Sequence, residues 1–539
     1  MENSMAKSKE QNYMYGAAIL TMGVVIMKVL GAIYKIPIAN IIGDDGYSMF
    51  LAAYNVYYVF FILATAGLPI ALSRLISEAK AEKRPMQAKR TFSVAWWTFF
   101  AIGLLCTAIM FFGAEFLATD ILHNPEAAPS IKAMAPALLL VCLLSAYRGY
   151  CQGYGNMIPT TVGQVLEVLF KVIAGLALAL FIVRSGFDKP YASAGAISGV
   201  TVGSLVALLY MMAYKAKNYR DTPEGKPDIP DSRLKIFRYF MRIGIPIALG
   251  SCVMALLNLV DSSLCMGRLQ SAAGFSLDEA QVLYGVYGKA QNLFNLPAAF
   301  ITPLTISVVP AIAAAIVRGE DDNATKISED SMRIAAALSM PMGIGLAVLC
   351  EPIMKIMYPT SHSSGPVLLL IMGLASIFVC LLLMENAVLQ ASGKEKYTMY
   401  TMIAGGAVKI GVNWFLVANP RINIYGAPIG TLASYFVMCA MNYVFMCVTL
   451  DKNPRLWKIV SGPLAASLVM GAGAWAVYGL AAKFVGVESW LKMAVCMMAG
   501  VAVAVVIYVV CVVCMRVITK EDMNLIPGGG KLAKLLHMR

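Results

Sequence analysis

The sequence predicts an all-α membrane protein with about fourteen transmembrane helices. We expect these helices to form two six-helix repeats of the same orientation, followed by two further helices. Three observations lead to this fold class. The composition is far more apolar than that of a soluble protein, hydrophobic segments of membrane-spanning length follow one another along the whole chain, and the two halves share landmarks in the same order.

The composition indicates a protein whose surroundings are largely lipid and not water. The 539 residues are 59% hydrophobic and 14% charged, and the mean hydropathy is +0.71. A soluble protein carries roughly 25% charged residues. The first hydrophobic segment, 13–42, is too long for a signal-peptide core, so we expect it to be retained as a helix. The twelve cysteines lie mostly in apolar segments and the three histidines lie apart from them. We therefore expect no metal site and no cofactor.

The helices were placed by the length of apolar chain that spans a bilayer, about twenty residues. The predicted spans are 13–42, 48–73, 91–113, 130–152, 158–183, 191–214, 236–262, 281–315, 331–350, 364–390, 397–418, 424–449, 457–482 and 489–515.

The distribution of Lys and Arg predicts the orientation of these spans. Most of them lie in the two tails and the even-numbered loops, and the most basic loops are 74–90 and 215–238. Short cytoplasmic loops are enriched in Lys and Arg, so both termini are predicted to be cytoplasmic. The net charge of +13 therefore reflects topology, and no nucleic-acid partner is expected.

An internal repeat divides the chain. Gln152 and Gln390 are each followed by a glycine three residues later and by a lysine nineteen residues later, and a glycine-bounded motif follows at 195–199 and again at 426–430. Six helices are thus repeated in parallel orientation, which is typical of transporters with two lobes around a central cavity.

The repeat gives the domain boundaries. We expect an N-terminal lobe at 1–214, a cytoplasmic linker at 215–235, a C-terminal lobe at 236–450, the last two helices at 451–516 and a cytoplasmic tail at 517–539.

Charged residues at membrane depth are costly and mark functional candidates. Cations outnumber acids there, which suits a cavity for phosphate or pyrophosphate. The candidates are Lys28, Arg148, Lys171, Lys289 and Lys409, with the acids Glu167, Asp261 and Glu385.

Each candidate also has a structural interpretation. Glu167 and Lys171 have the i,i+4 spacing of a local ion pair. Lys289 and Lys409 could extend toward the membrane surface instead of lining a cavity. Arg74 fits an interface anchor, and Asp261 fits a partner for a nearby cation.

Sequence motifs of hydrolytic enzymes are missing. The chain has no Walker A sequence, and its longest odd-numbered loop, about 114–130, holds acids without motif spacing. These observations argue against an ATPase and against a membrane glycosyltransferase or polymerase, which would need catalytic carboxylates on a sizeable outer loop.

The N-terminal quarter carries a family resemblance. The segments KVLGAIYKIP at 28–37, GDDGY at 43–47, AYN at 53–55 and AGLPIALSRLISE at 66–78 resemble the stage V sporulation protein B group of polysaccharide biosynthesis proteins. That group belongs to the multidrug, oligosaccharidyl-lipid and polysaccharide (MOP) exporter superfamily and is close to the MurJ lipid II flippases.

The resemblance implies alternating access around a cationic cavity lined by helices 1, 2, 7 and 8, with helices 13 and 14 forming a groove for the lipid tail. The implied substrate is an undecaprenyl-pyrophosphate sugar, and the implied location is the bacterial cytoplasmic membrane. Lys28 falls at one family arginine position, whereas Tyr34 and Asn55 replace others and Lys35 stands where an acid is usual. The residues implied for substrate binding are Lys28, Tyr34, Lys35, Asn55, Arg74, Asp261, Lys289 and Gln291, with Arg148, Glu167, Lys171 and Lys409 as secondary candidates.

Several functions stay open on sequence alone. The first is a flippase for lipid II, and the second is a flippase for another lipid-linked oligosaccharide of capsule or teichuronic type. A cation-coupled multidrug exporter is disfavoured because it needs an acid in helix 1, where this chain has Lys28. We expect a monomer coupled to the membrane potential or to a monovalent cation.

Overall fold

The computed structural model describes residues 2–218, 228–450 and 454–515. Side chains are described from Leu30 onward, apart from positions 32, 33, 249, 250, 253 and 254. The side chain of Lys28, part of the linker at 219–227 and the predicted tail at 517–539 therefore lie outside the described residues.

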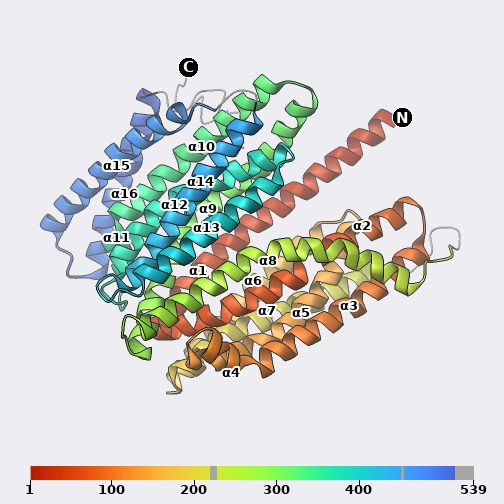
Figure 1. Cartoon of the computed structure of the whole chain (residues 1–539), viewed down its shortest axis with the longest axis horizontal. Helices are drawn as coiled ribbons and strands as arrows, with labels where there is room; N and C mark the ends of the chain where they lie inside the picture. The colour runs from red at the N-terminus through yellow and green to blue at the C-terminus, as the bar shows by residue number, and fades with distance from the viewer. Residues whose placement is uncertain (1, 219–227, 451–453, 516–539) are drawn as a thin grey trace. The chain divides into compact units, whose positions relative to one another are not determined.

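The described residues form helices and no strands, which confirms the predicted all-α class (Figure 1). Most predicted hydrophobic segments coincide with one helix each, but 13–42 and most of 48–73 lie in the single helix Glu2–Thr65, and 48–73 crosses a break at 66–67 into the next helix. The longer helices are α1 (Glu2–Thr65), α2 (Leu68–Ala81), α3 (Pro85–Phe112), α5 (Ala128–Gly153), α6 (Ile158–Arg184), α7 (Lys189–Asn218), α8 (Arg233–Ser271), α9 (Leu277–Val317), α10 (Asp321–Val348), α12 (Gly365–Ala391), α13 (Glu395–Leu416), α14 (Gly426–Thr449), α15 (Leu456–Val485) and α16 (Trp490–Cys514). Short helices fill the connections: α4 (Ala114–Phe116), η1 (Leu117–Ile121), η2 (Pro125–Ala127), α11 (Cys350–Met357) and η3 (Asn423–Tyr425).

The chain is a multi-pass membrane protein. Within the described residues, 11 helical segments are long and apolar enough to cross a bilayer. The first of them, Tyr34–Ala81, is 48 residues long and covers more than one predicted span. Helices α8 and α13 coincide with predicted spans but are not among the 11. The number fourteen therefore stays a prediction.

Helix α1 is two helices joined at a kink. Gly43 has φ 77° and ψ −176°, a backbone conformation that is almost exclusive to glycine. Pro37 lies one and a half turns earlier and lacks the N–H that would continue the helical hydrogen bonds. The sequence GDDGY therefore marks the point where the first apolar segment ends and the second begins.

The chain separates into two compact units, and each is described here by itself. The first comprises Met1–Gly267 and Leu277–Gly285, and the second comprises Arg268–Ser276 and Val286–Arg539. The first unit thus includes most of α8 and the first turns of α9.

Buried polar contacts hold the start of α9 in the first unit. The Gln281 amide donates to Asn124 Oδ1 (2.9 Å) and to Glu126 Oε2 (3.1 Å), and Asn124 donates to Ser48 Oγ (3.2 Å). Gly285 approaches the kink of α1 so closely that a Cβ there would fall 1.8 Å from the Asp44 carbonyl oxygen.

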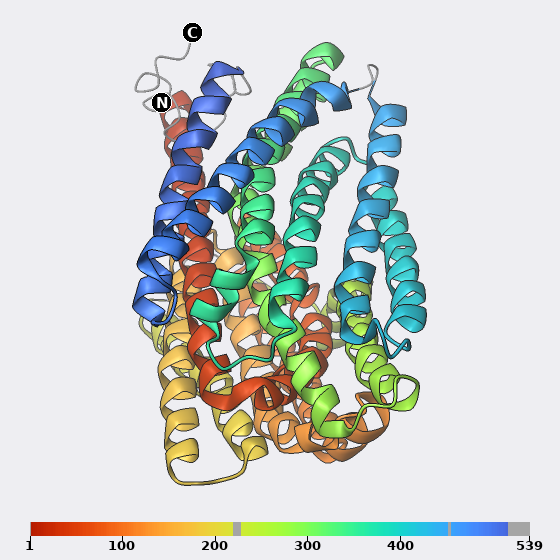
Figure 2. The ribbon, with the colours of Figure 1, turned by 90° about the vertical axis from the view of Figure 1, so that its left-hand side faces the viewer.

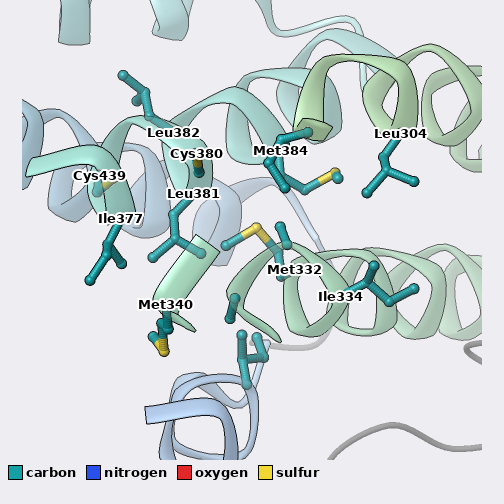
Figure 3. Close-up of a cluster of buried hydrophobic side chains, with 14 of the residues drawn as sticks. Leu304, Met332, Ile334, Met340, Ile377, Cys380, Leu381, Leu382, Met384 and Cys439 are labelled. Carbon is teal, nitrogen blue, oxygen red and sulfur yellow. The ribbon is translucent and has the colours of Figure 1, made fainter. Parts of the chain in front are cut away.

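The core of the second unit is rich in methionine and cysteine. Figure 3 shows side chains from α9, α10, α12 and α14 meeting there, among them Leu304, Met332, Met384 and Cys439. Flexible, polarizable side chains fill irregular gaps between helices. Helices α15 and α16 pack against each other (Figure 2), and α15 also packs on α10.

The same close helix–helix contact occurs in both units. A Cβ at Gly199 of α7 would lie 2.5 Å from the Lys171 carbonyl oxygen of α6, and a Cβ at Gly430 of α14 would lie 3.4 Å from the Lys409 carbonyl oxygen of α13. These are the lysines and glycine-bounded motifs that the sequence repeat aligns. Equivalent small residues therefore bring equivalent helices together in the two units.

Candidate functional site: embedded lysines and an apolar cavity

In the first unit, Lys35 and Lys171 form a cationic pair. Lys35 directly follows Tyr34 in α1, and Lys171 Nζ of α6 lies 5.9 Å from the centroid of the Tyr34 ring. The distance to the ring is within the cation–π range of about 6 Å. Tyr34 is buried and donates a hydrogen bond to the Ala196 carbonyl oxygen (2.9 Å), which fixes the ring under the ammonium.

Gly175 makes the room that this arrangement needs. A Cβ at Gly175 would lie 2.4 Å from the Tyr34 hydroxyl oxygen, so no larger residue fits beside the ring. Tyr34 and Lys35 come from α1, whereas Lys171 comes from α6. A glycine in α6 thus lets α1 place its aromatic ring below a lysine of α6.

The pair lies at membrane depth. Lys171 is at the midpoint of α6, about 20 Å from either end at 1.5 Å per residue. Lys35 is eight residues before the kink at Gly43, or about 12 Å along the helix. A bilayer core is about 30 Å thick, so Lys171, at the centre of this apolar helix, lies away from both membrane surfaces, and we expect Lys35 to lie at membrane depth as well. Placing a lysine at the centre of a membrane helix costs about 2.5–3.5 kcal/mol of insertion free energy, so we expect such a lysine to have more than a structural role.

Glu167 forms its ion pair with a different residue from the one that the i,i+4 spacing suggested. Its Oε2 accepts a hydrogen bond from Arg148 Nη2 at 2.6 Å, and its Oε1 accepts one from Ser204 Oγ at 3.1 Å. The i,i+4 interpretation, which paired Glu167 with Lys171, was therefore wrong. Arg148 of α5 forms the ion pair with Glu167 instead. Among the side chains that the structure describes, neither Lys35 nor Lys171 has a carboxylate partner.

The other predicted residues of the first unit lie apart from this pair. Asn55 is half-buried and donates to the Tyr284 hydroxyl (3.3 Å). Arg74 is exposed and forms an i,i+4 ion pair with Glu78 (2.9 Å). Asp261 is buried, and its Oδ1 lies 4.0 Å from Cys265 Sγ.

In the second unit, Lys289 is fully buried. Its ammonium lies 5.2 Å from the centroid of the Tyr358 ring. Burial raises the pKa of the Tyr358 phenol to about 12, so this neighbour is a neutral ring at physiological pH. Gln291 and Lys409 are half-buried.

An apolar cavity of about 510 Å³ lies between four helices of the second unit. Its walls are Pro297 and Phe300 of α9, several residues of α10, the chain just after α10 as far as Ile353, and parts of α15 and α16, including Ala504. The volume falls within the range of ligand pockets, about 300–1,000 Å³. A second apolar cavity, of about 490 Å³, lies beside α10 and α15 around Trp475.

The cavity includes residues of α15 and α16, the last two helices, for which the resemblance implied a tail groove; that role stays a prediction. Sequence alone did not reveal that α9 and α10 supply the opposite wall. Pro297, a proline inside α9, contributes to that wall. A run of small residues on α10, with Gly345 between Pro341 and Leu349, was the available signal.

Comparison with known proteins identifies the family. The polysaccharide biosynthesis protein family profile matches residues 14–316. The stage V sporulation protein B of Bacillus subtilis (strain 168) is 24% identical over 534 residues, which cover 97% of this chain and 99% of that protein. The lipid II flippase MurJ of the same organism is 23% identical over 487 residues, covering 87% of this chain and 88% of that protein.

Two solved structures have the same fold. A structure of the lipid II flippase MurJ in an inward closed conformation has a TM-score of 0.67 at 14% identity, covering 92% of this chain and 99% of that one. An inward-facing multidrug resistance MATE family transporter of the MOP superfamily has a TM-score of 0.63 at 14% identity, covering 79% of this chain and 97% of that one. The fold is therefore that of MOP transporters, which are not enzymes, and the chain belongs to the polysaccharide biosynthesis protein family.

Proposed function

We propose that this protein is a flippase that moves an undecaprenyl-pyrophosphate-linked peptidoglycan precursor, lipid II, across the cytoplasmic membrane by alternating access. The observation that carries the proposal is the pair Lys35 and Lys171, two cations at membrane depth without a described carboxylate partner. Such a pair suits a pyrophosphate, because charged hydrogen bonds to phosphate are the strong ones. Lys28, whose side chain lies outside the described residues, and Lys289, which is buried in the second unit, stay proposed as further substrate-binding residues.

The apolar cavity supports a lipid-linked substrate over a soluble anion. Its lining from α9, α10, α15 and α16 is almost entirely hydrocarbon. We propose that it receives part of the polyprenyl tail, since each CH₂ that leaves water contributes about 0.8 kcal/mol. The family relatives named for lipid II translocation support the identity of the headgroup.

Orientation and energy source complete the proposal. We propose that both termini are cytoplasmic, that residues 1–214 and 236–450 act as the two lobes, and that the protein works as a monomer. Each elementary charge that crosses the membrane is worth about 2.3 kcal/mol per 100 mV, so an inside-negative potential favours the outward movement of a pyrophosphate. A monovalent cation is the other proposed coupling partner.

The test is lipid II translocation in proteoliposomes. Wild type is compared with Lys35→Ala and Lys171→Ala, with Lys132→Ala as the control, because Lys132 is an exposed lysine paired with Glu115 (2.7 Å). A charged hydrogen bond contributes about 1.5–3 kcal/mol, so each test variant should lose roughly tenfold or more in rate while the control keeps it.

A variant of the cavity tests the tail separately. Ala504→Phe fills part of the cavity without touching a lysine, and we expect it to slow translocation of the long-chain substrate more than that of a short-chain analogue. Translocation of a capsule-type polyprenyl glycan, with none of lipid II, would overturn the substrate and keep the flippase. Unchanged rates in both lysine variants would overturn the anion site.

A further inference from the structure

A buried acid of the second unit has no part in the proposed substrate site. Glu385 of α12 is 3% exposed, and its Oε2 has no hydrogen-bond partner among the described residues. No ion pair between described side chains includes this carboxyl group. A buried carboxylate without a cation is very costly, so such a group takes up a proton or binds a cation. Glu385 is therefore a candidate binding site for a cation from solution.

A second unpartnered oxygen lies on the helix that packs against α12. Asn442 of α14 is fully buried, and its Nδ2 donates to Asn386 Oδ1 at 2.8 Å. The Asn442 Oδ1 atom has no hydrogen-bond partner in the part of the chain that the structure describes. Asn386 directly follows Glu385, so the two unpartnered acceptors come from adjoining positions of packed helices. Buried acceptors are normally satisfied, so two that are not indicate a missing donor.

The internal repeat allows this acid to be compared with the buried acid of the first unit. The spacing from Gln152 and Gln390 aligns Arg148 with Asn386. In the first unit, Arg148 donates to Glu167 at 2.6 Å, so a side chain of the protein neutralises the acid. In the second unit an amide stands at the arginine position, and the buried acid lies one residue before it. The positive charge that neutralises this second acid therefore has to come from solution.

A proton fits this site better than a metal ion. Hard cations such as Ca²⁺ and Mg²⁺ take about six to eight oxygen ligands. The site offers two unpartnered oxygens, and its surroundings are hydrocarbon and sulfur. Figure 3 shows Met384, the residue before Glu385, in one core with Met332 and Cys439. A proton needs a single oxygen, and it turns the carboxyl group into the missing donor.

The helices around α12 bring no further charge to this place in the described structure. The Cys439 thiol of α14 interacts with Glu385, and an ordinary thiol is neutral near pH 7. Lys409 lies about 21 Å from the start of α13, whereas Glu385 lies about 9 Å from the end of α12, and a three-residue turn joins these two helix ends. Side chains of the other neighbouring helices have partners of their own: Arg333 pairs with Asp330 in α10 (2.7 Å), Lys355 pairs with Glu351 in α11 (2.6 Å), and Tyr397 of α13 stacks on Phe445 of α14.

We propose that Glu385 is the proton-binding site of this transporter, and that it carries a proton inward as the lipid-linked substrate moves outward. This inference rests on the proposed function, because it names the coupling ion of the same transport cycle. The carboxyl group takes its proton from the outer side and releases it to water on the cytoplasmic side, where α12 and α14 end by the proposed topology. Release leaves a carboxylate that disfavours the packing of α12 on α14, which links the proton to a change of conformation. An inside-negative potential drives the proton inward and the pyrophosphate outward.

The first experiment detects the proton without any substrate. Infrared difference spectroscopy of the full chain between acidic and alkaline solution records the C=O stretching band of a protonated carboxyl group. We expect wild type to lose a band as the pH rises and Glu385→Gln to lack that band, which separates Glu385 from other acids. Cys439→Ala and Glu351→Gln, which changes an exposed acid of α11, should behave as wild type. Identical spectra of wild type and Glu385→Gln, or a wild-type band that persists at every pH, would overturn the proposal.

The second experiment measures lipid II translocation in proteoliposomes with and without a pH gradient, at zero membrane potential. One pH unit changes the equilibrium of a one-proton step about tenfold, so the wild-type rate should rise severalfold when the receiving side is acidic. The ratio of the two rates should fall to about one in Glu385→Gln, whereas Glu385→Asp, which keeps an acid, should retain part of the response.

The two experiments separate this inference from the proposed function. A gradient response that survives in Glu385→Gln overturns the proton site and keeps the flippase. A titrating Glu385 band without any translocation of lipid II supports the proton site and overturns the proposed substrate. Because the wild-type titration alone can contradict the proposal, the test does not depend on the folding of Glu385→Gln.

Discussion

The ion pair between Arg148 and Glu167 provides a sharp test of how charges are arranged in the first unit. If Arg148 neutralises Glu167, then removing Arg148 leaves a carboxylate in a largely dry position, whereas removing Lys171 leaves the acid satisfied. We therefore predict that Arg148→Ala lowers the free energy of unfolding and that Lys171→Ala hardly changes it. The i,i+4 spacing of Glu167 and Lys171 predicts the opposite order.

The magnitude follows from the burial of the pair. The side chains of Arg148 and Glu167 are 13% and 20% exposed, and their closest atoms are 2.6 Å apart. Breaking a fully buried pair costs about 3–5 kcal/mol, whereas exposed pairs contribute about 0.2–1 kcal/mol. A pair of this exposure lies between them, so we expect a loss of about 2 kcal/mol on Arg148→Ala. Ser204, the other partner of Glu167, holds part of the charge and keeps the loss below the buried limit.

The assay is a pair of double-mutant cycles in detergent micelles, with the free energy of unfolding as the readout. One cycle combines Arg148→Ala with Glu167→Ala, and the other combines Lys171→Ala with Glu167→Ala. We expect a coupling of about 2 kcal/mol in the first cycle and less than about 0.5 kcal/mol in the second. A larger coupling in the second cycle would refute the assignment of Glu167 to Arg148 and, with it, the argument that Lys171 is available to an anion.

Three further perturbations test other parts of the structure. Gly285→Ala should cost about 1–3 kcal/mol of unfolding free energy, because its Cβ would fall 1.8 Å from the Asp44 carbonyl oxygen, whereas Gly411→Ala meets nothing within 4 Å and should be neutral or stabilising; equal effects would contradict the close approach of α9 and α1. Glu385→Gln should change stability by less than about 1 kcal/mol, because this acid is buried without a described cation partner and so folds as the neutral acid; a loss above about 3 kcal/mol would show that the charged form is needed. Asp228→Ala should cost about 1–2 kcal/mol, since the carboxylate caps the backbone N–H groups at the start of α3, and hydrogen exchange in the first turn of α3 should accelerate; unchanged exchange would argue against the cap.

The helices could be predicted because the bilayer imposes one simple requirement on the chain. Every backbone group at membrane depth must bond within its own segment, so a long apolar run has to become a helix. That requirement located α3, α5 and α12 within a few residues. It also separated the two helices joined at Gly43, since the predicted spans 13–42 and 48–73 lie on either side of this kink. It did not detect the break at 66–67, where α1 ends and α2 begins inside the second predicted span.

The contacts between helices were harder to predict, because they depend on which helix faces which. The spacing of Glu167 and Lys171 is a feature of one helix, and it does not show which side chains of other helices lie close to Glu167. Arg148 precedes Glu167 by nineteen residues and lies in another helix, yet it donates the 2.6 Å hydrogen bond to this carboxylate. Lys35 was singled out as standing where an acid is usual in related proteins. The packing of α1 beside α6 depends on Gly175, because a Cβ at this position would collide with the Tyr34 hydroxyl oxygen. A pattern of charges in the sequence does not predict such a contact.

The chemistry of the two units suggests one class of molecule. The first unit holds a lysine pair that has no described acid to neutralise it, and the second holds a hydrocarbon-lined cavity of about 510 Å³. The apolar cavity does not complement a soluble anion, and the lysines do not complement a neutral lipid. A multidrug exporter for cationic compounds fits neither Lys35 nor Lys171, because like charges repel. We propose a substrate with a phosphate-bearing head and a long apolar tail for these two features. The lysine variants and the Ala504→Phe variant are therefore separate tests of the two halves of that proposed substrate.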